Sequence, residues 1–183
     1  ADAGFRPIAP DLPGFGRSSY AGSRWSICET AAGLVEIADR LSLDRFHMAG
    51  ISMGGTIALQ TAIDHADRLR KLVLINTFAT LRPKRWSEWS YLIKRYFRAR
   101  VKGVGTQAEM TARRIFPRED QAELRVELIS HIRNTDPVVY KTAMRELGLF
   151  DVRQYLKQIR IPSMVITGEN DTTVPLENQD ELA

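Results

Sequence analysis

Short apolar runs alternate with amphipathic segments along most of the chain. The apolar runs are typical of strands and lie at residues 5–11, 45–49, 71–76 and 162–168. Two segments between them, 26–41 and 54–63, have the residue spacing of helices. Ser26 and Glu29 form a capping box at the start of the first of these helices. Alternating strands and helices predict an α/β fold, in which helices cover a mostly parallel sheet in three layers.

Residues 81–150 have helical patterns and no strand signal, so we expect a helical insertion in the α/β core. Thr106 and Glu109 predict a capping box within the insertion. Asp136 followed by Pro137 predicts an N-cap with proline at the first helical position of a later helix. The predicted parts are a first section of the core, the insertion and a last section of the core, at residues 1–80, 81–150 and 151–183.

The composition is that of a soluble globular protein, with 44% hydrophobic and 26% charged residues in a chain of 183. No apolar run approaches the roughly 20 residues needed to cross a bilayer, so we expect no stable membrane insertion. Cys28 is the only cysteine, which excludes an intrachain disulfide, and no secretory signal pattern is present. These features predict a cytoplasmic protein with one core.

The net charge of +4 reflects one basic segment. Residues 82–102 contain eight basic side chains and one acidic side chain. This segment would attract a carboxylated substrate or lie near a membrane surface, although a solvated helix face is the commoner explanation. No phosphate-binding loop, metal-ligand spacing or nucleic-acid motif accompanies it. We therefore predict no metal, no cofactor and no nucleic-acid partner.

Residues 50–54, Gly-Ile-Ser-Met-Gly, match the G-x-S-x-G pattern of a nucleophile elbow. The pattern lies between a predicted strand and a predicted helix, which is the context that an elbow requires. Gly50 and Gly54 lack the Cβ atoms that would collide at a sharp reversal, so Ser52 would project its oxygen above the sheet edge. The Met53 N–H, at the positive end of the helix, would face a developing oxyanion. The alternative is a glycine-rich turn with an incidental serine.

Three segments, in this order and spacing, resemble the α/β-hydrolase family: DLPGFGRSS at 11–19, GISMGG at 50–55 and ITGENDTTVP at 166–175. The resemblance covers nearly the whole chain. In that family the acid of the catalytic triad follows a late strand in a G-x-x-D pattern, which implies Asp171. This acid would orient an imidazole and stabilise it when charged. The alternative for Asp171 is a turn residue before Pro175.

The rest of the machinery that the resemblance implies is not found in the sequence. The family order is serine, acid, histidine, but no histidine follows Asp171. For the three histidines that are present, His47, His65 and His131, we expect structural roles. The resemblance also places strand 5–11 fourth in the sheet, after a His-Gly loop that supplies a second oxyanion donor. We therefore expect an internal fragment of a larger hydrolase, without its first strands and its C-terminal catalytic histidine.

The resemblance makes residues 81–150 a lid over Ser52. Trp86, Trp89 and Ile93 recur at helical spacing near the start of this segment and form one apolar face. That face would line an acyl pocket or pack the lid against the body. The two roles are compatible.

The resemblance implies a serine hydrolase that cleaves a small-molecule carboxylic ester, thioester or lactone through an acyl-enzyme, similar to lidded esterases and enol-lactonase-like members. Ser52 argues against the dehalogenases and epoxide hydrolases of this fold, which use aspartate at the elbow. One alternative is a carbon–carbon bond hydrolase with the same triad. Another is a catalytically incomplete member that binds a ligand or partner. The sequence leaves the oligomeric state open.

Overall fold

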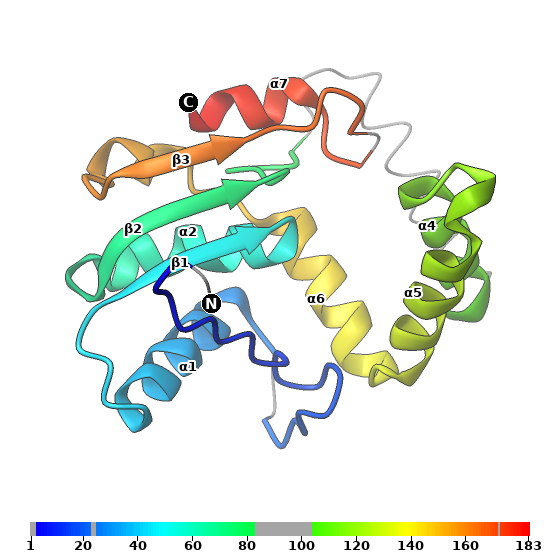
Figure 1. Ribbon diagram of the computed structural model, residues 1–183, viewed down its shortest axis with the longest axis horizontal. Helices are drawn as coiled ribbons and strands as arrows, with labels where there is room; N and C mark the ends of the chain where they lie inside the picture. Colours follow the sequence, from blue (N-terminus) through cyan, green and yellow to red (C-terminus); the bar gives the residue numbers. More distant parts are fainter. Residues whose placement is uncertain (1–2, 23–24, 83–103, 172) are drawn as a thin grey trace.

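The computed structural model has a three-stranded parallel sheet at its centre (Figure 1). The residues that it describes are 3–22, 25–82, 104–171 and 173–183. The strands are β1 (Phe46–Ile51), β2 (Leu69–Ile75) and β3 (Ser163–Ile166), in the spatial order β1-β2-β3. These strands confirm three of the four predicted ones, with ends shifted by one or two residues.

All three strands end at the same edge of the sheet. Ile51 at the end of β1 pairs with Ile75 of β2, and Ile75 pairs with Ile166 at the end of β3. Loops that follow β1 and β3 therefore begin on either side of the end of β2. The predicted α/β class with a parallel sheet is confirmed.

The strand predicted at 5–11 is wrong, because the segment forms no strand in the structure. Pro7 and Pro10 have no N–H group to donate to a ladder, and the segment pairs with no strand of the described sheet. Phe5 and Ile8 are exposed. The Phe5 ring packs edge-on against His47 at 5.5 Å between centroids, so the segment touches β1 without extending the sheet.

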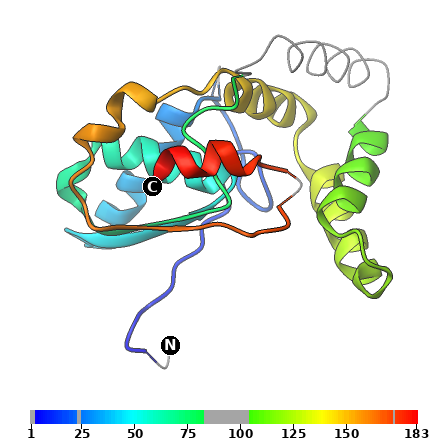
Figure 2. The same cartoon turned by 90° about the horizontal axis from the view of Figure 1, so that it is seen from above.

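Two helices cover one face of the sheet (Figure 2). Helix α1 (Ile27–Arg40) begins at its predicted cap, where the Ser26 hydroxyl accepts the Glu29 N–H at 3.1 Å. Helix α2 (Met53–Asp64) follows β1 after one residue, and a 3-10 turn (Ala66–Arg68) leads from it to β2. The helices predicted at 26–41 and 54–63 are therefore confirmed.

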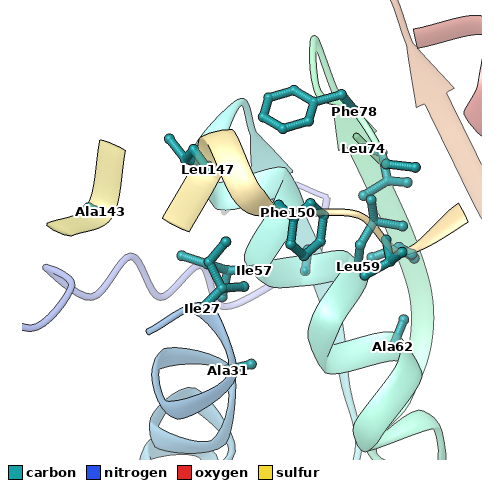
Figure 3. Close-up of a cluster of buried hydrophobic side chains, with 14 of the residues drawn as sticks. Ile27, Ala31, Ile57, Leu59, Ala62, Leu74, Phe78, Ala143, Leu147 and Phe150 are labelled. Carbon is teal, nitrogen blue, oxygen red and sulfur yellow. The ribbon is translucent and has the colours of Figure 1, made fainter. Parts of the chain in front are cut away.

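The main core lies between these helices and the sheet (Figure 3). Ile57 and Leu59 from α2 and Leu74 from β2 are almost fully buried. Beyond β2 the Phe78 ring packs edge-on against Phe150, with 6.5 Å between centroids. Burying an apolar side chain of this size stabilises a fold by about 1.5–3 kcal/mol, so these contacts hold α2 firmly on the sheet.

The other face of the sheet carries apolar side chains that remain exposed. We call this the open sheet face. Ile51, Met164 and Ile166 are 61%, 59% and 43% exposed. The register places Met164 beside Val73, and both Ile51 and Ile166 beside Ile75. Paired residues of a parallel sheet point to the same side, so these side chains share the face opposite α1 and α2.

The described part of residues 81–150 is helical, as predicted, and has no strand. Its elements are α4 (Val104–Ile115), a 3-10 turn (Glu119–Gln121), α5 (Ala122–Asn134) and α6 (Pro137–Leu149). Helices α4 and α5 pack together at one end of the molecule, and α6 leads back to the core (Figure 1).

One of the two helix starts predicted in the insertion is correct. The Asp136 carboxylate accepts the N–H groups of Val138 and Val139 at 2.7 and 3.1 Å and caps α6. The capping box predicted at Thr106 is wrong, because α4 already includes residues 104 and 105.

The insertion leaves the body and returns to it at one point, which we call the neck. Thr80 and Asp151 form an antiparallel bridge, and the Val152 N–H donates to the Ala79 carbonyl at 3.0 Å. Arg82 approaches Asp151 at 3.4 Å between charged atoms. The two chain segments that lead into and out of the insertion are thus joined directly.

The last part of the chain returns to the sheet. A 3-10 segment (Arg153–Gln158) leads from the neck to β3, and α7 (Leu176–Gln179) and a final 3-10 turn (Asp180–Leu182) follow the loop after β3. Within the described ranges, every helix is too short or too polar to cross a membrane.

Candidate active site

Ser52 lies at the single residue between β1 and α2, in a strained backbone conformation. Its φ and ψ are 50° and −115°, a region that costs a non-glycine residue about 1–3 kcal/mol. Its N–H donates to the Ile75 carbonyl at 3.0 Å, and its carbonyl accepts the Gly55 and Thr56 N–H groups. The side chain is exposed. The sharp turn expected at residue 52 is therefore present.

The glycines around this turn have different steric roles. A Cβ on Gly50 would overlap the Gly54 carbonyl, so only glycine fits there without a shift. A Cβ on Gly54 would meet nothing within 4 Å, so the collision predicted for Gly54 is wrong. The second close approach belongs to Gly55, where a Cβ would lie 2.5 Å from Thr77 Cβ. In the sequence, the only sign of this close approach is that Met53 is followed by two glycines, Gly54 and Gly55.

Met53 is the first residue of α2, so its N–H has no acceptor within the helix. The helix dipole adds a partial positive charge at this end. Met53 as a whole residue is half-buried and follows Ser52 directly. This is the chemical character that an oxyanion donor needs.

Asp171 lies in the loop that follows β3, which we call the acid loop (residues 167–171 and 173–175). Its Oδ1 accepts the Thr173 N–H at 2.7 Å, the Val174 N–H at 3.1 Å and the Thr173 hydroxyl. Its Oδ2 accepts a hydrogen bond from Gln179 Nε2 at 3.2 Å. Four donors therefore fix the orientation of this carboxylate.

Opposing effects act on the pKa of Asp171. Burial raises it, but the hydrogen bonds from Thr173, Val174 and Gln179 together outweigh burial and hold the pKa below its ordinary value. Asp171 is therefore a carboxylate at neutral pH.

Gln179 is a site residue that the sequence did not indicate. Its side chain is 1% exposed, and Nε2 also donates to the Val174 carbonyl at 3.0 Å. Its Oε1 has no hydrogen-bond partner among the described residues. A glutamine in a short terminal helix gives no signal by itself, because its importance comes from the loop that the fold places beside it.

Helix α4 also contacts the acid loop. Arg114 Nη2 donates to the Thr173 carbonyl at 3.2 Å, over 59 residues of sequence. The inserted helices therefore touch the loop that carries Asp171.

The structure brings the two predicted catalytic residues to one edge of the sheet. Ser52 directly follows β1, and Asp171 follows β3 by five residues. The middle strand separates them, and the outer strands are about 10 Å apart at two strand spacings. The predicted pocket residues Trp86, Trp89 and Ile93 lie outside the described residues.

The three histidines lie elsewhere. His47 is within β1, and His65 is at the other end of the sheet, between α2 and β2. His131 is on α5, exposed and 3.7 Å from Glu127. Within the described ranges, neither a histidine contact to Asp171 nor a cluster of three His, Cys, Asp or Glu side chains suited to a metal is found.

Comparison with known proteins identifies the family. The model of the alpha/beta hydrolase fold matches residues 1–183. The chain belongs to this family, as its sequence motifs had indicated.

Individual relatives act on different bonds, according to their names. The chain is 32% identical to the "Putative carbamate hydrolase RutD" of Caulobacter sp. (strain K31), over 98% of this chain and 68% of the relative. The solved structure of the enol-lactonase from Burkholderia xenovorans LB400 has a TM-score of 0.79 and 26% identity, over 94% of this chain and 66% of the other.

Haloalkane dehalogenase 2 of Mycobacterium bovis is 35% identical over 56% of this chain and 41% of the relative. The chain matches the carbamate hydrolase and the enol-lactonase over nearly the whole of its own length. It spans about two thirds of the length of each of these two relatives.

Proposed function

We propose that the protein is a serine hydrolase that cleaves a carboxylic ester, thioester or lactone through an acyl-enzyme. The observation that carries the proposal is the strained, exposed Ser52 between β1 and α2, with the Met53 N–H beside it. A strained turn persists only when its surroundings hold it, and such turns concentrate at functional sites.

In the proposed reaction Ser52 Oγ attacks the carbonyl carbon of the substrate. The carbonyl electron pair moves to oxygen, and the Met53 N–H stabilises the resulting oxyanion. When the carbonyl re-forms, the alkoxide or thiolate leaves with a proton, and water later cleaves the acyl-enzyme. An imidazole carries the proton in both steps, and the Asp171 carboxylate stabilises its charged form.

The proposal needs a histidine that the three in this chain do not supply, and we place it in a segment that belongs to the longer relatives. The order of the strands supports this arrangement, because Ser52 and Asp171 follow the two strands that flank β2 at the same edge of the sheet. An imidazole placed between them would bond to one residue through each ring nitrogen.

We also propose that α4 to α6 act as a lid and that the substrate is a small molecule. The bond from Arg114 to the Thr173 carbonyl supports a lid, because it joins an inserted helix to the acid loop. The single cysteine supports the cytoplasmic location that we expect.

The names of two relatives support attack at a carbonyl group, since carbamates and lactones are both acyl compounds. A carbamate is a further acyl substrate that the same mechanism would accept. The dehalogenase relative acts on a carbon–halogen bond according to its name, and the serine at position 52 argues against that chemistry here. A hydrolase of carbon–carbon bonds that uses the same catalytic triad is the alternative within this fold.

The test is covalent labelling with a fluorophosphonate in the complete gene product that carries this chain. We expect an adduct on the Ser52 peptide, and we expect Ser52→Ala to abolish it. The same variant should lower the rate of any p-nitrophenyl acetate turnover by at least about 1,000-fold. Ser42→Ala is the matched control, because Ser42 is also exposed and has a positive φ of 58°.

An unlabelled wild type would contradict the hydrolase. It would favour the second candidate, a catalytically incomplete member that binds a ligand or partner, which the positions of the three histidines support. Labelling that survives in Ser52→Ala would assign the reaction to another residue.

A further inference from the structure

The carboxyl end of β2 is bonded both to the Ser52 turn and to the strand before the acid loop. The Ile75 carbonyl accepts the Ser52 N–H at 3.0 Å. The N–H of the same peptide group bonds in the other direction, since the Asn76 N–H donates to the Ile166 carbonyl at 2.9 Å. Because β2 is the middle strand (Figure 1), this one peptide group at its end bonds to both sides, to the Ser52 turn after β1 and to the end of β3.

The Asn76 side chain extends this bonding into the acid loop. Its Oδ1 accepts the Gly168 N–H at 2.7 Å, and the Gly168 carbonyl accepts the Asp171 N–H at 3.0 Å. Asn76 has a φ of 42°, a left-handed conformation that asparagine adopts more readily than most residues. A Cβ on Gly168 would lie 3.3 Å from Asn76 Nδ2. The start of the acid loop is therefore held by a side chain 92 residues earlier in the sequence.

Thr77 makes the corresponding contact on the Ser52 side. Thr77 is 1% exposed, and its hydroxyl donates to the Ser52 carbonyl at 2.8 Å. Gly55, in the first turn of α2, approaches the same side chain so closely that a Cβ would collide with it. A shift of the Ser52 turn would therefore break a partly buried hydrogen bond and disturb this packing.

We infer that Asn76 and Thr77 are positioning residues that set the separation between Ser52 and Asp171, one by holding the acid loop and the other by holding the Ser52 turn. The catalytic consequence of this inference rests on the proposed function. A displacement of about 1 Å between reacting groups can cost about 100-fold in rate. Each residue acts through the backbone that it holds.

Five variants separate the side-chain bonds from the shape of the backbone. Asn76→Gly keeps access to the left-handed φ but loses the acceptor, whereas Asn76→Asp keeps an acceptor. Thr77→Val keeps the volume but loses the hydroxyl, whereas Thr77→Ser keeps the hydroxyl. Thr61→Val is the matched control, because the buried Thr61 hydroxyl donates to the Ile57 carbonyl at 2.9 Å in the same helix, away from the turn.

Two measurements on the complete gene product test the inference. The first is the rate at which a fluorophosphonate labels Ser52, which we expect Asn76→Gly and Thr77→Val to lower by about 10- to 100-fold. Asn76→Asp and Thr77→Ser should recover most of the rate, and Thr61→Val should leave it unchanged. The second is hydrogen exchange at the Gly168 amide, which Asn76→Gly should accelerate by about tenfold.

The outcomes distinguish this inference from the proposed function. If the wild type is labelled and Asn76→Gly and Thr77→Val are labelled as fast, the inference is overturned and the proposed function stands. If the wild type is not labelled, the proposed function fails, and an unchanged Gly168 exchange rate overturns the inference independently. A loss in Thr61→Val as large as in Thr77→Val would indicate a general structural effect and would also overturn it.

Discussion

A methyl group at Gly50 would overlap the Gly54 carbonyl, whereas a methyl group at Gly54 would meet open space. The two glycines are four residues apart in one motif, but only the first is required for steric reasons. Two close approaches therefore accompany the strained turn at Ser52, one within the motif between Gly50 and Gly54 and one between Gly55 and Thr77.

We predict opposite effects for two alanine substitutions in this motif. Gly50→Ala should lower the free energy of unfolding by about 1–3 kcal/mol, because the backbone must move to admit the methyl group. Gly54→Ala should raise it by about 0.4–1 kcal/mol, since alanine is less flexible than glycine in the unfolded chain. Urea denaturation of both variants measures the difference. Equal losses would contradict the steric assignment.

Residues that act on their sequence neighbours were predictable. Ser26 and Asp136 cap helices that begin beside them, and Ser52 turns the chain between adjacent elements. Asn76 and Gln179 were not predictable, because their partners are brought to them by the fold. Asn76 bonds to a residue 92 positions away, and no local pattern encodes that contact.

At the level of elements, helices and buried strands were predicted well, since the apolar spacing that defines them is local. The strand at 5–11 was predicted wrongly because a strand exists only when another strand pairs with it. The capping box at Thr106 failed because α4 begins before it. The role proposed for Ser52 depends on its motif and that for Asp171 on the resemblance, and both stay predictions.

The neck of the insertion depends on a partly buried ion pair. Asp151 accepts two hydrogen bonds from the Arg153 guanidinium, at 2.9 and 2.8 Å, and its side chain is 17% exposed. The hydrogen bonds from Arg153 are the largest influence on the Asp151 carboxyl, and they lower its pKa despite burial.

We predict that Asp151→Asn lowers the free energy of unfolding by about 1–2 kcal/mol at neutral pH. The pKa of Asp151 is below its unfolded value of about 3.9, so this stabilisation is complete above that value and is lost as the pH falls through the folded pKa. Thermal unfolding of wild type and variant at neutral pH and below pH 3.9 should show the difference shrinking on acidification.

Asp120→Asn is the control for this prediction. Asp120 accepts a similar pair of bonds from Arg118, at 3.0 and 2.6 Å, but both side chains are mostly exposed. Solvent screens such a pair, so we expect little change in stability. A difference between Asp151→Asn and wild type that persists in acid would contradict the assignment to the Asp151 charge.

At the scale of the whole molecule, the described residues are asymmetric about the sheet. Helices α1 and α2 lie on one face (Figure 2), and on the open sheet face Ile51, Met164 and Ile166 are exposed to solvent. Contiguous exposed apolar groups of this kind bind hydrophobic dyes and promote association.

We predict that the 183-residue chain binds the dye ANS on the open sheet face and that Met164→Lys reduces the fluorescence. Stability should change by no more than about 0.5 kcal/mol, because Met164 is mostly exposed. Met110→Lys is the matched control, since Met110 is 58% exposed but lies on α4. Equal dye binding in the two variants would place the apolar site elsewhere.

The neck has a consequence for how such a protein can change over generations. Because the chain leaves the body at Thr80 and returns beside it at Asp151, a change in the length of the loop between α4 and α5 need not shift the register of the strands. Such a change would also leave α6 in place, whose Val139, Ala143 and Leu147 pack in the main core. Under the proposed lid role, new substrates can be explored by changes in α4 and α5 while the sheet stays as it is.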